Sequence, residues 1–538
     1  MQLYLTHTLR LSLVALAGSL LLQGQGNTGS ILGTVTDSSA AVIPNAKVMI
    51  TNKGTGVKAE STSDSVGNYL FNFLQPGSYR VEAEVSGFKR FVRENVTLEM
   101  TRQLRIDVTL EAGQLTESVS VTATTPLLET ETGSLATTIE NRQVVSLPTI
   151  NRNPQDFRLL VPGVVLNRDG NPVTQGGLVR KDPYYIDGAH SSSHVWSGNP
   201  VNPNPDVIGE FKVLTNSFSA EYGETSGAVM QSTTKSGTNS LHGTAFEFLQ
   251  NDKLNAGNYY TATRPTLRRN QYGGTIGGPI IKNKTFFFFD MQFTKQRGTL
   301  PFTNLTVPTQ AFRNGDFSSI PNVIYDPNTS RTENGAVVRT PFTGNAIPAS
   351  RISNAAKNLQ ALYPLPQLNT NFANYTNFGP NTINNYEYDI KIDHNFSDKD
   401  KFFARYSGRQ SNSDPASAFP NPDAGGRNPG QLGFGSTRTP GRQAVVNYVR
   451  VITPRLTNDL HLGWFQVYPK RTVAGYGKVS TNSLGILGLP NGDDKLGTPD
   501  VQFTNFAPLG SSGDTILFEL QNSNSLVNVT SWVKDRHT

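Results

Sequence analysis

Short runs in which apolar and polar residues alternate recur along most of the chain, and they predict β-strands. Side chains two positions apart point to the same face of a strand, so each apolar set predicts one half-buried strand. Four such sets lie near the N-terminus: Ile31, Gly33 and Val35; Tyr69, Phe71 and Phe73; Tyr79, Val81, Ala83 and Val85; and Leu104, Ile106, Val108 and Leu110. Turn-forming residues separate them, and the spacing predicts a small β-sandwich over residues 29–112.

A second kind of alternation in the C-terminal part places charged residues on one face of each strand. Tyr386, Tyr388, Ile390 and Ile392 alternate with Glu387, Asp389, Lys391 and Asp393. Strands of membrane β-barrels show this pattern, because one face contacts lipid and the other faces the polar interior. About eight segments are candidate strands: 243–249, 271–281, 285–294, 386–396, 402–409, 442–452, 456–468 and 525–534.

Two long connections, 298–383 and 411–440, are rich in Asn, Pro and Gly, which is typical of extracellular loops of such barrels. Half-buried sheets of water-soluble proteins carry similar alternation, so an array of soluble β-sandwiches remains the alternative.

The N-terminus has the pattern of an export signal. His7 and Arg10 precede an apolar run at 11–22, and small residues follow at 24–26. We expect residues 1–26 to be a signal peptide that is cleaved after Gly26, which sends the mature protein out of the cytoplasm.

Composition narrows the functional classes. The 538-residue chain has no cysteine, which excludes disulfides, thiolate metal sites and cysteine nucleophiles. Charged residues make up only 16% of the chain, while 49 glycines and 32 prolines indicate many turns. The net charge is +6, but the basic residues are scattered, so we expect no nucleic-acid partner.

Patterns of catalytic or metal-binding residues are weak. His190 and His194 have the spacing of ligands on a helix, but the Gly, Ser and Pro around them disfavour a helix. The glycines at 273–278 lack the lysine of a phosphate loop, and Ser226 lacks the frame of a nucleophile elbow. We therefore expect no enzyme, no cofactor and no metal site.

Residues 29–112 resemble the carboxypeptidase regulatory-like domain. The resemblance rests on the stretches 29–37, 43–48, 67–71 and 74–79. It implies a prealbumin-like sandwich without catalytic activity of its own. The segment contains neither Cys nor His, so we expect it to fold without zinc.

Residues 125–237 contain six blocks in the order found in plug domains of TonB-dependent receptors. The blocks are 147–153 with 159–164, then 185–188, 208–213, 220–223, 226–229 and 234–239. They are most similar to the Oar-type branch, in which a regulatory-like sandwich precedes the plug. Thr215, Asn216 and Ser217 replace the usual Arg-Gly-Pro, and Gln231 replaces the usual Asn, so ligand residues of siderophore receptors are not carried over. Glycines at 188, 223, 227 and 237 are expected to supply turns with positive φ.

The resemblance implies a mainly β fold: a prealbumin-like β-sandwich, an α+β plug, and residues 238–538 as the N-terminal part of a transmembrane antiparallel β-barrel. Barrels of outer-membrane transporters have about 22 strands. Residues 526–533 resemble a strand that leads into a return strand, so we expect the chain to be truncated at its C-terminus.

The linker at 113–124 contains a segment that resembles the TonB box, through which outer-membrane transporters contact the energising protein TonB. An extended segment of this kind can pair with the edge of a partner sheet. The resemblance implies that TonB binds Glu117, Ser118, Val119, Ser120, Val121, Thr122, Ala123 and Thr124. The alternatives are a last strand of the preceding sandwich or a plain linker.

The resemblance as a whole predicts an outer-membrane receptor for active uptake of a large solute: a glycan, a peptide or a metal chelate. Its partners would be TonB, outer-membrane lipid and that solute, and carbohydrate binding is one possibility. The alternative is an Oar-type surface protein that serves structure, adhesion or protein export without nutrient uptake.

Overall fold

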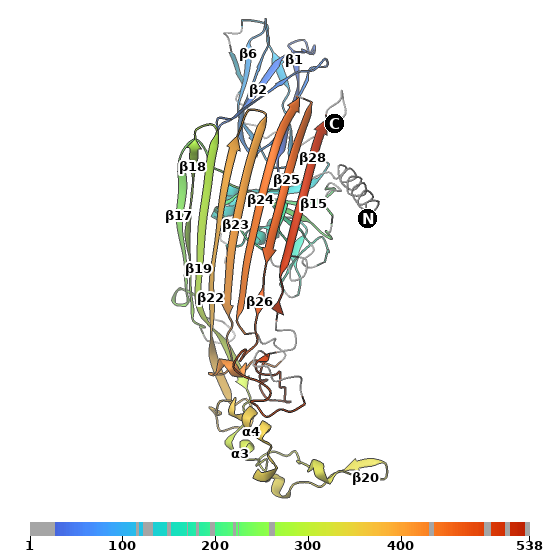
Figure 1. Cartoon of the computed structure of the whole chain (residues 1–538), viewed down its shortest axis with the longest axis vertical. Coiled ribbons are helices and arrows are strands. Elements are labelled where there is room, and N and C mark those ends of the chain that lie inside the picture. The colour runs from blue at the N-terminus through green and yellow to red at the C-terminus, as the bar shows by residue number, and fades with distance from the viewer. Residues whose placement is uncertain are drawn as a thin grey trace, which may run out of the picture.

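The computed structural model describes residues 27–114, 118–121, 133–147, 152–168, 170–178, 182–193, 199–218, 222–223, 225–257, 264–429, 435–453, 455–488, 496–511 and 517–532. A sandwich, a plug and a large antiparallel sheet are arranged so that the sandwich lies at one end of the sheet and long connections lie at the other (Figure 1). The predicted signal peptide and residues 117 and 122–124 of the predicted TonB box lie outside the described residues.

The sandwich consists of two sheets. The first contains β4 (Asn68–Leu74), β1 (Gly29–Asp37), β7 (Gln103–Arg105) and β8 (Val108–Leu110). The second has the order β3 (Lys58–Thr62), β2 (Lys47–Asn52), β5 (Gly77–Glu84), β6 (Arg90–Leu98) and β9 (Ser118–Val121). The predicted inward residues form the core, since Ile31, Tyr69, Tyr79, Val81 and Ile106 are all buried.

The sandwich has more strands than the alternation predicts. In β6, a φ of 57° at Asn95 lies within a register shift against β5 and interrupts the period, so that Phe91 and Val96, which are five positions apart, both belong to the core. The expected inward position of Phe73 is wrong. Its φ of 54° lies within a register shift between β1 and β4, and Leu74 enters the core in its place.

The plug is built on a five-stranded sheet with the order β10 (Leu135–Glu140), β15 (Ile208–Asn216), β16 (Val229–Thr234), β13 (Tyr184–Ile186) and β14 (Ala189–His190). Helix α2 (Asn141–Ser146), the 3-10 helix η2 (Pro154–Leu160) and the hairpin of β11 (Val164–Leu166) and β12 (Pro172–Thr174) accompany it. Phe157, Tyr184, Phe211 and Met230 are members of its core.

Glycines serve two different purposes in the plug. Gly188 has the expected positive φ of 79°, whereas Gly223, Gly227 and Gly237 do not have positive φ, which corrects the prediction. Gly237 is required for close approach instead, because a Cβ there would lie 2.4 Å from the carbonyl oxygen of Phe287 in the barrel.

The large sheet contains all eight predicted strands, each antiparallel to its neighbour. The order is β17 (His242–Asn251), β18 (Leu267–Ile281), β19 (Thr285–Leu305), β22 (Tyr375–Asn395), β23 (Asp400–Asp414), β24 (Thr437–Thr453), β25 (Leu456–Val467) and β28 (Gln521–Trp532). Short strands β26 (Lys470–Arg471) and β27 (Leu517–Phe518) join beside β24.

Several strands run further into the expected loops than the sequence pattern indicates. β19 continues to Leu305 and β22 begins at Tyr375, because backbone pairing continues where polar residues replace the apolar positions. The connections contain α3 (Gln310–Arg313), α4 (Asn354–Ala361), the hairpin β20 (Arg331–Glu333) and β21 (Ala336–Val338), and 3-10 helices η3 (Asp252–Leu254), η4 (Pro327–Thr329), η5 (Thr343–Asn345), η6 (Ala349–Arg351) and η7 (Pro422–Ala424). In the described part of the chain, no helix has the length and apolarity needed to cross a membrane.

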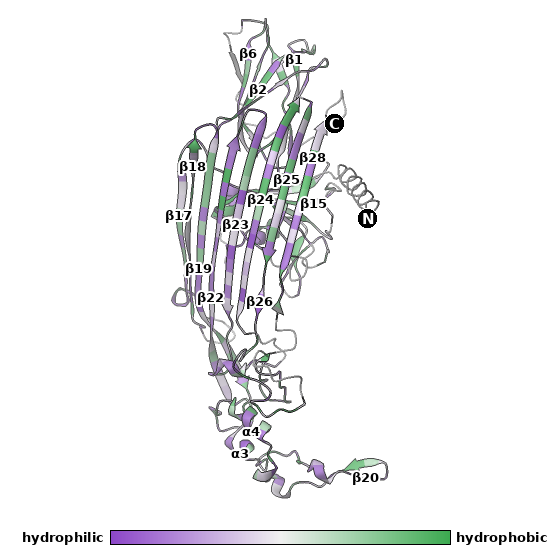
Figure 2. Cartoon of the chain, viewed as in Figure 1, coloured by the Kyte–Doolittle hydropathy of each residue, from purple (hydrophilic) through white to green (hydrophobic). Residues whose placement is uncertain are grey.

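The large sheet buries its charged face and exposes its apolar face, as the alternation predicts. Ile390 and Ile392 are 43% and 42% exposed, whereas Asp389 and Lys391 are each only 4% exposed. Figure 2 shows the alternation of hydrophobic and hydrophilic residues along these strands. The plug covers the charged face, so polar side chains of the sheet meet polar side chains of the plug.

Candidate functional site

A buried charge cluster joins the plug to the large sheet. The carboxylate of Asp187, which follows β13, forms an ion pair with Arg405 on β23, with 2.7 Å between its oxygen and Nε of the guanidinium. Nζ of Lys391 on β22 lies 3.6 Å from the same carboxylate. Thr234 at the end of β16 donates to it from its backbone N–H at 2.9 Å and its hydroxyl at 2.6 Å. We call Asp187, Arg405 and Lys391, together with Asp389, the inner charge cluster.

Arg405 has a polar partner on each side. Its guanidinium donates to Oε1 of Gln443 at 3.0 Å, contacts Asp389 at 3.4 Å, and reaches the backbone carbonyl of Ile186 at 3.4 Å. Ser407 lies between Arg405 and Asp389 and is hydrogen-bonded to both. A buried charge is tolerated only where partners of this kind satisfy it.

The electrostatics keep Asp187 ionised. Burial raises the pKa of its carboxyl, but the charges of Lys391 and Arg405 and the hydrogen bonds from Thr234 outweigh burial, so its pKa lies below the ordinary value. The anion is therefore present at neutral pH and holds both barrel cations.

Further polar contacts tie the plug to the first strands of the sheet. Asn204 donates to Asp290 on β19, and Nε of Arg152, which also pairs with Asp206 inside the plug, donates to Oε1 of Gln292 on β19 at 3.3 Å. The Arg152 guanidinium also lies 4.0 Å from the ring centre of Phe248 on β17, a cation–π contact. By contrast, Ala189, Phe403 and Val445 make only a small apolar cluster between plug and sheet. The interface is thus mainly polar.

The sandwich is fastened to the plug at Glu210 on β15. The Glu210 carboxylate accepts from the backbone N–H of Met100 at 2.9 Å, and Nζ of Lys212 donates to the Met100 carbonyl at 3.2 Å. Met100 is fully buried. Burial raises the pKa of Glu210 to about 7, so this carboxyl titrates near neutrality.

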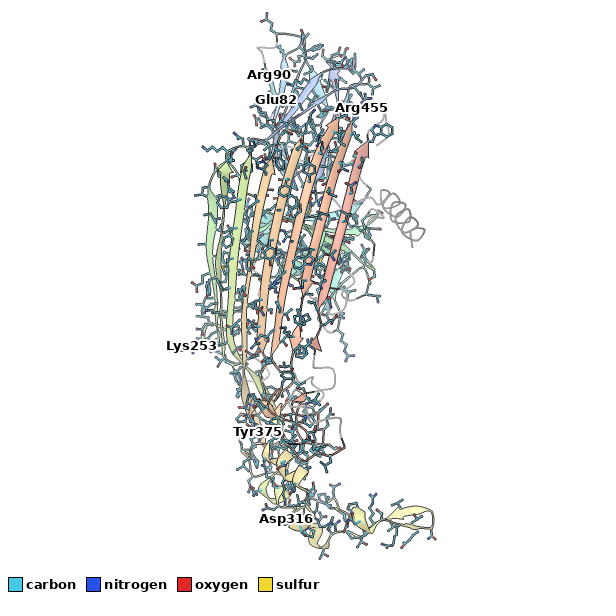
Figure 3. The ribbon with its side chains drawn as sticks, in the orientation of Figure 1. Glu82, Arg90, Lys253, Asp316, Tyr375 and Arg455 are labelled. Atoms are coloured by element: carbon cyan, nitrogen blue, oxygen red, sulfur yellow. The ribbon has the colours of Figure 1, made fainter. Side chains whose placement is uncertain are left out.

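The sandwich also contacts the short-turn end of the large sheet. Asn239 donates to the carbonyls of Gly54 and Thr55 at 3.0 and 2.7 Å, and Asn72 donates to Ser531 on β28 at 2.8 Å. Figure 3 places Arg455, in the turn between β24 and β25, at this end and Lys253 at the opposite end. A cavity of about 620 Å³ lies between the three units and extends from Glu99 and Glu210 to Asp187 and Lys391.

A second cavity lies at the other end of the sheet, among the long connections. It has a volume of about 590 Å³ and is lined by residues that include Phe302, Asp414, Arg427, Tyr476 and Lys478. Its walls combine two aromatic rings, apolar side chains and charged groups.

The predicted TonB box is placed in part. Ser118–Val121 form β9, which pairs in parallel with β6 as the last strand of the second sandwich sheet. This is the arrangement that the sequence left open as an alternative, and it is compatible with partner binding because β9 has a second edge. The contact with TonB remains a prediction.

The sequence did not indicate which residues join the units. Asp187 lies in the plug-like block 185–188 and Arg405 in the predicted strand 402–409, but nothing in the sequence predicts that the two side chains are in contact. Of the histidine pair, His190 packs against Tyr185 with ring centres 5.3 Å apart, and His194 lies outside the described residues. Within the described ranges, no three His, Cys, Asp or Glu side chains are grouped to hold a metal ion.

Comparisons with known proteins agree with this architecture. The model of the carboxypeptidase regulatory-like domain matches residues 30–111, and that of the outer membrane beta barrel domain matches residues 233–538. The chain is 26% identical over 326 residues to the TonB-dependent transporter Oar of Myxococcus xanthus. That match covers 56% of this chain and 30% of the relative, so the chain spans about a third of the relative's length.

Solved structures similar to the chain include the siderophore receptor PirA from Acinetobacter baumannii and the outer membrane transporter YddB from Escherichia coli. PirA is 15% identical with a TM-score of 0.38, over 63% of this chain and 40% of its own. YddB is 10% identical with a TM-score of 0.39, over 63% of this chain and 39% of its own.

Proposed function

The chain belongs to the outer membrane β-barrel family of TonB-dependent transporters, as its sequence predicted, and we propose that it takes part in active uptake of a large solute. The family consists of transporters rather than enzymes, and the protein is placed in the outer membrane. The solute would be a glycan, a peptide or a metal chelate, and the cavity among the long connections is the proposed point of entry.

The observation that carries the proposal is the polar interface between plug and sheet. Separating two apolar surfaces in water costs about 25 cal/mol per Å² of apolar area, whereas separated polar groups regain hydrogen bonds from water. The contacts that Asp187, Asn204 and Arg152 make with the sheet belong to this second kind. An interface of this kind holds the plug closed at rest and can be hydrated when the plug is pulled.

The proposed mechanism begins at the TonB box. TonB pairs with residues 117–124 and pulls toward the inner membrane, with energy from the proton gradient. The chain leads from there to β10, which is the edge strand of the plug sheet and pairs only with β15 among the described strands. Force applied at an edge strand is able to open a sheet one hydrogen bond at a time. The plug then rearranges and opens a path beside the inner charge cluster.

The test measures accumulation of labelled solutes by cells that make the receptor. The panel contains oligosaccharides, peptides and ferric chelates, and the matched variant lacks residues 117–124. Loss of accumulation in the deletion variant at an unchanged surface level supports uptake, and dissipating the proton gradient should cause the same loss. Accumulation that neither treatment changes would contradict active uptake.

The second candidate is an Oar-type role in surface organisation, adhesion or protein export. The close packing of the sandwich against the barrel end favours it, because three units held together would also suit a scaffold. In that case no solute of the panel would accumulate, and loss of the chain would change cell adhesion or secreted proteins instead.

A further inference from the structure

We infer that TonB docks on the outer edge of β9 while β9 keeps its place in the sandwich, so that the sandwich sheet and TonB become one continuous sheet. The inference rests on the proposed function, because it takes residues 117–124 as the contact with TonB. It adds that the sandwich is part of the docking surface.

The pairing of β9 leaves one of its edges unused. Register partners are Arg90 with Ser118, Phe91 with Val119, Val92 with Ser120, and Arg93 with Val121. β9 ends the order β3, β2, β5, β6, β9, and no described strand pairs with its other edge. The open edge of a strand presents unpaired N–H and C=O groups, which a strand of a partner protein can satisfy.

The direction of β9 suits a partner that pulls. β6 runs toward the plug, because it ends at Leu98, just before Met100 contacts Glu210. β9 is parallel to β6, so Ser118 lies beside Arg90 at the end remote from the plug, where Figure 3 labels Arg90 in the sandwich. A strand added to β9 therefore lies on the side wall of the sandwich, clear of the barrel end.

The occupant is a β-strand of TonB, because the chain is similar to a TonB-dependent transporter. The open edge offers only the short stretch Ser118–Val121, which is enough for a strand that arrives in an extended conformation. With β6 on the inner edge, β9 is already held extended, so a partner strand would not have to order it. β9 has then lost most of its conformational entropy before TonB binds, so binding does not have to offset this loss.

This arrangement decides what moves first when TonB pulls. β9 is hydrogen-bonded to β6, and the end of β6 leads to Met100 at the plug contact. The pull would lift the sandwich from Glu210 before it reaches β10 through the connecting chain. The sandwich would therefore transmit the force from TonB to the plug.

The main test locks β9 to β6 with a disulfide in the variant Arg90→Cys with Ser118→Cys. These residues are register partners, and the chain has no cysteine of its own, so oxidation has one possible intramolecular product. Binding of the purified periplasmic domain of TonB is measured to receptor in outer-membrane fractions, oxidised and reduced. The two single-cysteine variants are the controls.

Oxidation should change TonB affinity by less than about threefold, a small change on the free-energy scale of binding. A loss of about tenfold or more that a reductant restores would overturn the inference, because β9 would then have to leave β6. Absence of TonB binding by the reduced receptor would instead count against the proposed function.

A second test needs no disulfide. Backbone N–H groups of successive residues in a strand point to opposite edges, so Val119→Pro and Ser120→Pro each remove a donor from a different edge of β9. The variant that removes the outward donor should lose TonB binding while the protease resistance of the sandwich in the whole chain is kept. Joint loss of both properties in both variants would overturn the inference.

Discussion

The guanidinium of Arg405 in the barrel and the carboxylate of Asp187 in the plug lie 2.7 Å apart, and neither side chain has any exposed surface. Because the two residues belong to different units, this ion pair connects the plug to the large sheet. Lys391 on β22 is a second cation beside the same carboxylate.

Replacing Arg405 by Gln should strongly weaken plug docking. Breaking a buried pair leaves an uncompensated charge and typically costs about 3 to 5 kcal/mol. The readout is urea-induced release of the plug, followed by protease sensitivity in detergent. Arg438→Gln is the matched control, because its pair with Asp414 is about 40% exposed and should contribute less than about 1 kcal/mol. Equal effects of the two variants would contradict the role of burial.

Docking of the sandwich on the plug should weaken as the pH rises from about 5 to 8. The pKa of buried Glu210 is raised from 4.5 to about 7, so the docked state holds a proton that the undocked state releases. A carboxyl group whose pKa is higher in the docked state stabilises docking at pH values below its ordinary pKa of 4.5. This contribution is lost as the pH rises through the raised pKa of about 7. Cleavage of the sandwich connection by protease, measured against pH, should show this trend.

The control for that experiment is Glu210→Gln, which keeps a hydrogen-bond acceptor for Met100 but does not titrate. Its cleavage should not depend on pH in this range. A pH dependence that survives in Glu210→Gln would contradict the assignment of the titration to Glu210.

Val121→Pro should abolish contact with TonB and leave export and surface level intact. Proline removes a backbone donor and fixes φ, while the sandwich and barrel keep their own cores. Site-specific crosslinking to TonB in membranes measures the contact. Undiminished crosslinking would show that the contact with TonB does not depend on strand pairing by this segment, whose residues Ser118–Val121 would then serve the sandwich sheet alone.

Residues 29–112 should fold alone without zinc. Their core is continuous, and Tyr79 within it is 4% exposed, with its hydroxyl donating to the Gln75 carbonyl at 2.7 Å. Burial also raises the pKa of Tyr79 to about 12. Tyr79→Ala should therefore cost about 3 kcal/mol or more, as large aromatic truncations in cores do.

Thermal melts of the excised segment test this, with and without a chelator. Val66→Ala is the matched control, since Val66 is 41% exposed and its truncation should have little effect. A non-cooperative melt, or one that a chelator shifts, would contradict independent folding.

The strands could be predicted from the sequence because their signal is local. Alternation in 386–396 identified both the strand and its buried charged face, and the inward set at Tyr69 and Tyr79 identified the sandwich core. Strand ends were underestimated at Leu305 and Tyr375, where pairing continues without alternation.

The joints between units could not be predicted, because they depend on how separately folded parts meet. Asp187 and Arg405 each carry a charge at an inward position, but no spacing in the sequence relates them. Met100 and Glu210 are joined partly through a backbone N–H, which every residue other than proline possesses.

The alternation of the large sheet also has a consequence for biogenesis. Ile390 and Ile392 are separated by Lys391, and charged or polar residues recur at this interval along the strand. A nascent strand of this kind is never apolar enough over about 18 residues to be retained in the inner membrane during secretion. The buried charges that hold the plug thus also allow the polypeptide to cross the inner membrane before it inserts into the outer membrane.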